Sequence, residues 1–373
     1  MCTSVMSNYL PPCVNMIFYS LLADKLLIKA MLLLHISHRI ISLVSCALKP
    51  NMENHLRLCL LLFLFLCSPI PPALSFGQGR KLSALVPSAP LVLKYHKGPL
   101  LTGPAPINVF ILWYGNFTPS QKAIVTDFLS SFNGGSTTTP SVTSWWATTG
   151  RYTGSGKQGV SRDVRIGGQA SDASSSLGKN LKRSDIPLLV KGALSKRWFP
   201  ILSSRGIYLV LTAEDVNVER FCMNSCGFHD YVRLSSGRRI LFGWVGNSGV
   251  ECPGQCAWPF AAPAYGPPTP PLIPPNGDVG VDGMIINIAA IVAGTATNPF
   301  NTGYYQGDAL APQEAVTACT GIFGKGAYSG YPGDLVVDNT TRASYNAHGV
   351  NNRRFLVPAM WEPSRHSCKT PIS

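Results

Sequence analysis

The 373-residue chain is 46% hydrophobic and only 13% charged, and its formal net charge is +13. This composition supplies enough apolar side chains for one or two folded domains and excludes a disordered tail. The segment from 151 to 239 holds 15 basic and seven acidic side chains, so much of the positive charge is local.

An apolar run from Leu58 to Cys67 follows a basic lead that contains Arg57, and small residues come after it at 73–75. This is the order of a secretory signal peptide, so we assign residues 52–75 to one. The apolar run is shorter than the about 20 residues that a membrane-spanning helix needs. We therefore expect a secreted product with no stable membrane span in its mature form.

The position of this signal indicates that Met52 is the start and that residues 1–51 are an upstream extension. The alternative is an N-terminal membrane anchor around residues 30–46. His35, His38 and Arg39 interrupt that stretch, and polar or charged side chains within a span are costly.

Six of the 11 cysteines remain once residues 1–75 are removed, which indicates three disulfides in an oxidising compartment. Six cysteines allow 15 pairings, and the sequence does not choose among them. A zinc site made from the two Cys-x-x-x-Cys pairs and His229 is the alternative, and it would require reduced thiols. The six cysteines are Cys222, Cys226, Cys252, Cys256, Cys319 and Cys368.

Residues 76–106 are rich in Pro, Gly and Ser and are predicted to form a linker that ends in an extended arm at 91–95. Residues 107–114 form an apolar, aromatic and β-branched run, which predicts a buried strand and the start of the folded domain at 107–373. Asn116 and Asn339 each begin an Asn-x-Thr glycosylation acceptor.

Helices and further strands follow in alternation, which predicts an α/β fold with a mixed sheet and flanking helices. Thr118 and Pro119 form a start signal for the first helix. The expected helices are 119–132, 140–149 and 186–198, and the expected strands are 164–166, 207–211 and 240–245. The run from Met284 to Ala296 is apolar on nearly every side, so we expect a central helix that is covered all round.

The sequence offers no motif that specifies a catalytic centre. Residues 154–159 match G-x-G-x-x-G but follow no strand and open no helix, so a flexible loop is the better interpretation. No G-x-S-x-G motif is present. Asp278 with Asp282, or Glu214 with Asp215, could pair as glycosidase carboxylates, but their settings are more typical of turns or a calcium contact.

We therefore expect no catalytic residue, no cofactor and no metal, and name one candidate cleft formed by His229, Trp258, Asp278 and Asp282. Outside the cell, the basic surplus favours acidic surfaces such as uronic-acid polysaccharides or anionic lipid as the partner, and export argues against nucleic acid.

Aromatic side chains in Gly/Pro-rich segments suggest a stacking platform for sugar rings, although most aromatics pack in cores and only exposed ones would serve. These side chains are Trp258, Tyr265, Tyr304, Tyr305, Tyr328 and Tyr331.

The run Cys-Pro-Gly-Gln-Cys-Ala-Trp-Pro-Phe at 252–260 is highly specific. The segments that accompany it are Val109–Gly115, Ser144–Trp146, Cys222–His229, Trp244–Ser248, Asp278–Pro299 and Tyr345–Gly349. Together they resemble the plant EXORDIUM/phosphate-induced protein family.

The resemblance implies a secreted protein of the apoplast or cell wall, linked to growth control, brassinosteroid response and nutrient status, with no established enzymatic activity. Acidic cell-wall polysaccharide or an extracellular receptor is then the expected partner. A wall-acting hydrolase that uses carboxylates or His229 is the alternative.

A weaker likeness concerns residues 282–299, an apolar helix that ends in Thr-Asn-Pro. Some zinc-peptidase-like proteins have a His-Glu helix that runs into a Thr-Asp-Pro turn, which suggests a zincin-like scaffold here. The ligand positions hold Ala289, Ala290, Ile291 and Gly294, none of which binds zinc. The resemblance therefore implies a zincin-like scaffold without its metal.

Overall fold

The computed structural model describes residues 91–134, 138–223, 225–308 and 311–372. They belong to one compact unit, Ser88–Ser373. The predicted extension at 1–51, the predicted signal peptide at 52–75 and the first part of the predicted linker, 76–90, lie outside the described residues.

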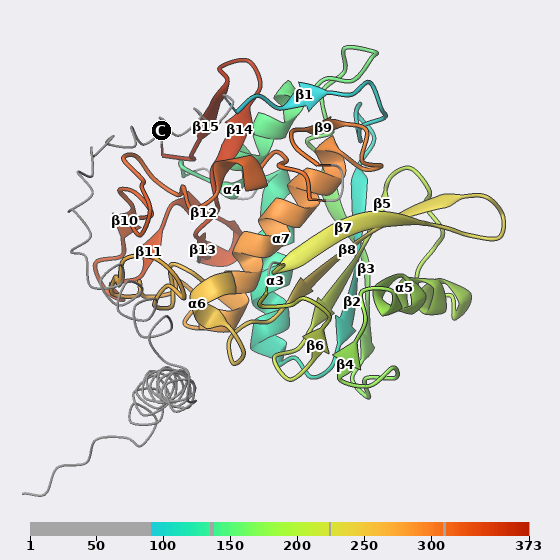
Figure 1. Cartoon of the computed structure of the whole chain (residues 1–373), viewed down its shortest axis with the longest axis horizontal. Helices are drawn as coiled ribbons and strands as arrows, with labels where there is room; N and C mark the ends of the chain where they lie inside the picture. The colour runs from blue at the N-terminus through green and yellow to red at the C-terminus, as the bar shows by residue number, and fades with distance from the viewer. Residues whose placement is uncertain (1–90, 135–137, 224, 309–310, 373) are drawn as a thin grey trace, which may run out of the picture. The chain divides into compact units, whose positions relative to one another are not determined.

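A five-stranded mixed sheet forms the centre of the fold, with the strand order β3-β2-β5-β8-β7 (Figure 1). The first four strands are parallel, and β7 pairs antiparallel with β8 at one edge. Parallel strands buried on both faces have nearly continuous apolar sequences, which is why β2, β5 and β8 were predictable. The strands are β2 (Ile107–Tyr114), β3 (Val164–Asp172), β5 (Gly206–Thr212), β7 (Gly227–Arg233) and β8 (Arg239–Gly246).

The structure corrects the sequence interpretation at both edges of the sheet. β3 runs to Asp172, six residues beyond the predicted strand 164–166, because its exposed side chains alternate with half-buried ones as on an edge strand. β7 was not predicted, because it mixes glycine, histidine and aspartate and is half-buried along its length. This strand carries His229, so the omission affects the candidate site.

Helices cover both faces of the sheet (Figure 1). α3 (Pro119–Ser130) and α7 (Val279–Thr297) lie on one face, and α5 (Asp185–Ser195) lies on the other. α3 begins as predicted, because Thr118 accepts from the Gln121 backbone N–H and Gln121 reciprocates in a capping box. The predicted helix at 186–198 is α5 and ends three residues earlier.

α7 confirms the predicted central helix and extends it from 284–296 to Val279–Thr297. Its length and hydropathy would suffice to cross a membrane, but most of it is buried within the fold. The sheet packs against it on one side, and the short C-terminal strands lie on the other (Figure 1). A helix that is apolar all round requires such complete cover.

The remaining elements are short. α4 (Val142–Trp146) and the 3-10 turn η2 (Ala147–Arg151) confirm the predicted helix near 140–149, and the arm at 91–95 pairs as β1 with β9. The predicted loop at 154–159 is a turn closed by a bridge between Thr153 and Gly159. The other elements are β1 (Lys94–Tyr95), η1 (Ser131–Asn133), β4 (Asn180–Leu181), β6 (Asn217–Val218), α6 (Pro253–Cys256), β9 (Tyr304–Tyr305), η3 (Thr317–Cys319), β10 (Val336–Val337), β11 (Ser344–Tyr345), β12 (Ala347–His348), η4 (Val350–Asn352), β13 (Arg354–Phe355), β14 (Met360–Glu362) and β15 (Ser367–Lys369).

Three disulfides join the six cysteines of residues 76–373. Cys222 bonds to Cys252 and Cys226 bonds to Cys256, so two parallel bridges connect the segment before β7 to α6. The third bridge, Cys319–Cys368, connects η3 to β15. The thiols are therefore consumed in pairs, and the alternative zinc site built from Cys-x-x-x-Cys has no thiolate ligands.

We expect the two parallel bridges to be strongly non-additive. Each closes nearly the same loop, so removing one leaves the unfolded chain almost as constrained as before. Replacing either pair of cysteines by alanine should lower the free energy of unfolding by well under the about 2–4 kcal/mol that a typical disulfide contributes. Replacing both pairs should lower it by at least this typical contribution. Urea unfolding of the two single-bridge variants and the combined variant checks this. Equal, additive losses would contradict it.

Candidate functional site

His229 stands on β7 with its ring against the α7 side of the strand. Its Nε2 lies 2.8 and 3.0 Å from the two carboxylate oxygens of Glu314, and both side chains are almost fully buried. Asn298, at the end of α7, donates from Nδ2 to Glu314 Oε1 at 2.7 Å. A histidine, a glutamate and an asparagine from three separate elements therefore form one buried cluster.

Gly294 of α7 makes room for this cluster. A Cβ at this position would lie 2.6 Å from Glu314 Oε2 and 2.9 Å from His229 Nε2. Burial by itself lowers the pKa of His229, but the charge and hydrogen bond of Glu314 outweigh it and raise the pKa above its usual value. His229 Nδ1 is buried and has no hydrogen-bond partner among the described residues.

A groove of ≈ 780 Å³ runs beside β7 and has the His229–Glu314 pair in its wall. We call it the β7-edge groove. Arg183, Arg220 and Asp230 also line it, and neither arginine forms an ion pair with a carboxylate among the described residues. The guanidinium of Arg183 stacks at 3.8 Å on the ring of Phe228.

The pKa of Arg183 lies below its usual value. Burial lowers this pKa, and the nearby charge of Arg220 lowers it further. Glu219 and Asp230 oppose the shift without abolishing it. An anion placed between the two guanidinium groups would relieve the repulsion between their charges, so the β7-edge groove is suited to an anionic ligand.

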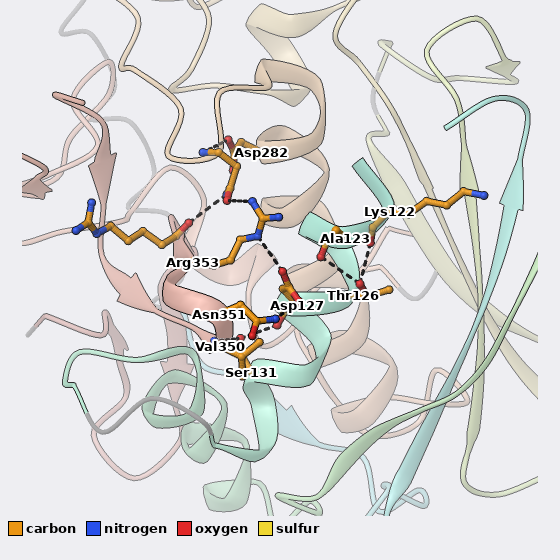
Figure 2. A network of polar contacts seen from close by, with 11 residues as sticks. Lys122, Ala123, Thr126, Asp127, Ser131, Asp282, Val350, Asn351 and Arg353 are labelled. Atoms are coloured by element: carbon orange, nitrogen blue, oxygen red, sulfur yellow. Dashed lines mark hydrogen bonds and ion pairs between the residues drawn. The ribbon is translucent and has the colours of Figure 1, made fainter. Parts of the chain in front are cut away.

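Asp282 belongs to a different network, at the first turn of α7 (Figure 2). Its carboxylate accepts two hydrogen bonds from Asn276, from the backbone N–H at 2.9 Å and from Nδ2 at 2.7 Å. Asn276 Oδ1 accepts from Arg353, which is ion-paired with Asp127 of α3 at 2.9 Å. The network thus connects α7 to α3 through the C-terminal segment.

Burial raises the pKa of Asp282 to about 7, although the two hydrogen bonds from Asn276 act in the opposite direction. The charge of Asp278 adds to the rise. Asp278 itself is the N-cap of α7, accepting from the Val281 N–H, and it also accepts from Gln121 of α3. Both aspartates therefore have structural contacts at the start of α7.

Trp258 lies in neither network. It lines a cavity of ≈ 490 Å³ together with Tyr265 and Tyr328, and a neighbouring cavity of ≈ 440 Å³ together with Tyr331. The other two tyrosines of the predicted platform are elsewhere: Tyr304 stacks on Tyr95, and Tyr305 stacks on His96. The structure thus brings four of the six predicted aromatic side chains to two adjoining cavities.

The four residues of the candidate cleft are not held in one set of contacts. His229 packs near Gly294, and Asp282 lies 12 residues earlier on the same helix, which corresponds to about 18 Å along the axis. Glu314 and Asn298 are the partners that sequence reasoning missed. A lone glutamate before the apolar Ala315 and Val316 was the available signal, since buried carboxylates need a partner.

The other candidate groups also have simple positions. Asp215 pairs with Lys179 at the surface, and Glu214 is exposed. Asn116 and Asn339 are both exposed, as glycosylation acceptors must be. Within the ranges that the structure describes, no three His, Cys, Asp or Glu side chains converge as ligands for a metal ion.

Comparison with known proteins gives the family. Residues 93–371 match the family model described as "Phosphate-induced protein 1 conserved region". The chain belongs to the EXORDIUM/phosphate-induced protein family. It is 50% identical over 308 residues to Protein EXORDIUM-like 2 of Arabidopsis thaliana, a match that covers 79% of this chain and 94% of the relative.

Two further members of the EXORDIUM family are similarly close. Protein PHOSPHATE-INDUCED 1 of Nicotiana tabacum is 49% identical over 300 residues, covering 79% of this chain and 93% of its own. Protein EXORDIUM of Arabidopsis thaliana is 46% identical over 305 residues, and the match covers 79% of this chain and 94% of the relative. No solved structure matches the chain, so the zincin-like scaffold stays a prediction.

Proposed function

We propose that this EXORDIUM-family protein is secreted and acts in the apoplast and cell wall as a non-enzymatic regulator of plant cell growth, within brassinosteroid and nutrient-status responses. Its three disulfides suit an oxidising, extracellular compartment. Exposed Asn116 and Asn339 are accessible to glycosylation there. The proposal includes a zincin-like scaffold without metal, since the ligand positions hold Ala289, Ala290, Ile291 and Gly294.

The proposal includes a ligand class, acidic cell-wall polysaccharide, bound at the β7-edge groove. The observation that carries it is the pair Arg183 and Arg220, two arginines that face one groove without a carboxylate ion pair among the described residues. Uronic-acid carboxylates supply counter-charge beyond that of Glu219 and Asp230, and Arg matches their planar geometry. An extracellular receptor with an acidic surface is the other partner class that this groove would accept.

Retention on polygalacturonate tests this ligand class. The wild-type protein should be retained at low salt and released as salt rises, because the contacts are electrostatic. The variant Arg183→Gln/Arg220→Gln should be released at clearly lower salt. Arg197→Gln/Arg342→Gln is the matched control, since it removes the same charge from two exposed arginines outside the groove.

Equal release of the two double variants would show that net charge alone, and not the groove, accounts for retention. Released sugar or peptide would instead support the hydrolase alternative. The geometry does not favour that alternative, because His229 Nε2 is bonded to Glu314 and Nδ1 is buried. A general base must reach the proton that it abstracts.

A further inference from the structure

The two aromatic cavities around Trp258 lie outside the β7-edge groove and have different chemistry. The ≈ 490 Å³ cavity is lined by Trp258, Tyr265 and Tyr328 with glycine, alanine and small polar residues, and no charged side chain is among them. This lining offers no counter-charge for an ion, which favours a neutral ligand. We refer to it as the Trp258 cavity.

Tyrosines in the Trp258 cavity are unusually exposed. Tyr265 is 83% exposed and Tyr328 is 70% exposed. Their hydroxyl groups, and the indole N–H of Trp258, have no hydrogen-bond partner within the described part of the chain. Three aromatic faces with free polar atoms at their rims offer both stacking and hydrogen bonding to one ligand.

The ≈ 440 Å³ cavity adjoins the first one, because both are lined by Trp258 and Gly330. Tyr331, Pro259 and Leu272 add aromatic and apolar wall, and Asp334 adds one carboxylate, which accepts from the Tyr331 hydroxyl at 2.6 Å. A ligand that passes over Trp258 from one cavity into the other is therefore longer than a single sugar-sized ring. Pockets of this size normally combine apolar surface with a few polar groups that fix orientation.

We propose that the Trp258 cavity is a binding site for a neutral oligosaccharide. A pyranose ring has an apolar C–H face that stacks on aromatic side chains and hydroxyl groups that donate and accept hydrogen bonds. Gln255 donates from Nε2 to the Met223 carbonyl, so its Oε1 remains as an acceptor for a sugar hydroxyl.

A proline-rich peptide is the competing ligand for an aromatic groove. Proline has no N–H and cannot donate to Gln255 Oε1, so the polar lining of the Trp258 cavity matches hydroxyl groups better. The site is also independent of the acidic polysaccharide proposed for the β7-edge groove, because the two hollows have no lining residue in common.

Calorimetric titration with cellohexaose, xylohexaose, mannohexaose and galactohexaose tests the proposal. At least one should bind with an affinity that high salt does not change, since no ion pair is formed. Tyr265→Ala/Tyr328→Ala should weaken that binding about tenfold or more, through loss of two stacking faces. Both side chains are exposed, so the fold should be retained, and a far-ultraviolet spectrum confirms it.

Two controls separate this site from others. Trp198→Ala removes an exposed aromatic side chain that does not line the Trp258 cavity. Arg183→Gln/Arg220→Gln alters only the β7-edge groove. Neither variant should change the binding of neutral sugars. Absence of binding to all four oligosaccharides would overturn the proposal. So would binding that the tyrosine double variant leaves intact, or tyrosine-dependent binding of oligoproline in place of the sugars.

Discussion

Replacing Glu314 by alanine should reduce the free energy of unfolding by about 3–5 kcal/mol, because it leaves a buried histidine without its counter-charge. His229 Nε2 and Asn298 Nδ2 would both lose their acceptor in a closed interior. Such a loss is a large fraction of the about 5–15 kcal/mol that stabilises a typical domain. Urea unfolding at pH 6 measures it.

Glu314→Gln is the matched variant, since it keeps the size and one acceptor oxygen of the side chain and removes only the charge. It should lower the free energy of unfolding less than alanine does, and it should also change how this free energy depends on pH. The raised pKa of His229 stabilises the wild-type fold below pH 6.5, and this stabilisation is lost as pH rises through the folded-state pKa. Identical losses for alanine and glutamine, with unchanged pH dependence, would contradict the charged pair.

Raising the pH from about 4 to about 7 should destabilise the wild-type protein through Asp282. Its pKa rises from 3.8 to about 7 on folding, so the folded state holds a proton that the unfolded state has released. The stabilisation is complete below the unfolded-state pKa and is lost as pH rises to the folded-state value. The full shift corresponds to about 4 kcal/mol at most, measured by unfolding at a series of pH values.

Asp282→Asn should abolish most of this decline, because an amide does not titrate. Asp278→Asn is the control, since asparagine is an equally good N-cap. The decline should persist in it, reduced only by loss of the Asp278 charge that helps to raise the pKa of Asp282. The charge of Asp278 acts on Asp282 directly. Arg353 is connected to Asp282 by way of Asn276, and Arg353 is ion-paired with Asp127. A wild-type stability that increases between pH 4 and 7, with no change in Asp282→Asn, would show that Asp282 is ionised throughout.

The buried parts of the fold were largely predictable from the sequence. β2, β5 and β8 are continuous apolar runs, and α7 is apolar all round, so burial alone indicates their type. β7 was not predictable in this way, because an edge strand that mixes glycine, histidine and aspartate with aromatic side chains lacks the pattern of a buried one. Its identity comes from pairing with β8, a tertiary contact.

The candidate site was predictable only in part, for a similar reason. His229 stood out as one of few histidines, but Glu314 is 85 residues away and no local pattern joins them. Disulfide pairing is likewise a property of the folded chain, since 15 connectivities fit the same six cysteines. By contrast, an aspartate just before an apolar helical run is an N-cap signal, and Asp278 could have been assigned from it.

Fractionation of plant cells that produce this chain is the most direct test of secretion with paired cysteines. Apoplastic fluid, a salt extract of the cell wall and the intracellular contents are collected separately. After alkylation of free thiols, we expect the protein in the fluid and the wall extract with all six cysteines of the folded region unmodified. They are paired as Cys222–Cys252, Cys226–Cys256 and Cys319–Cys368. Protein retained inside the cell with these cysteines alkylated would contradict it.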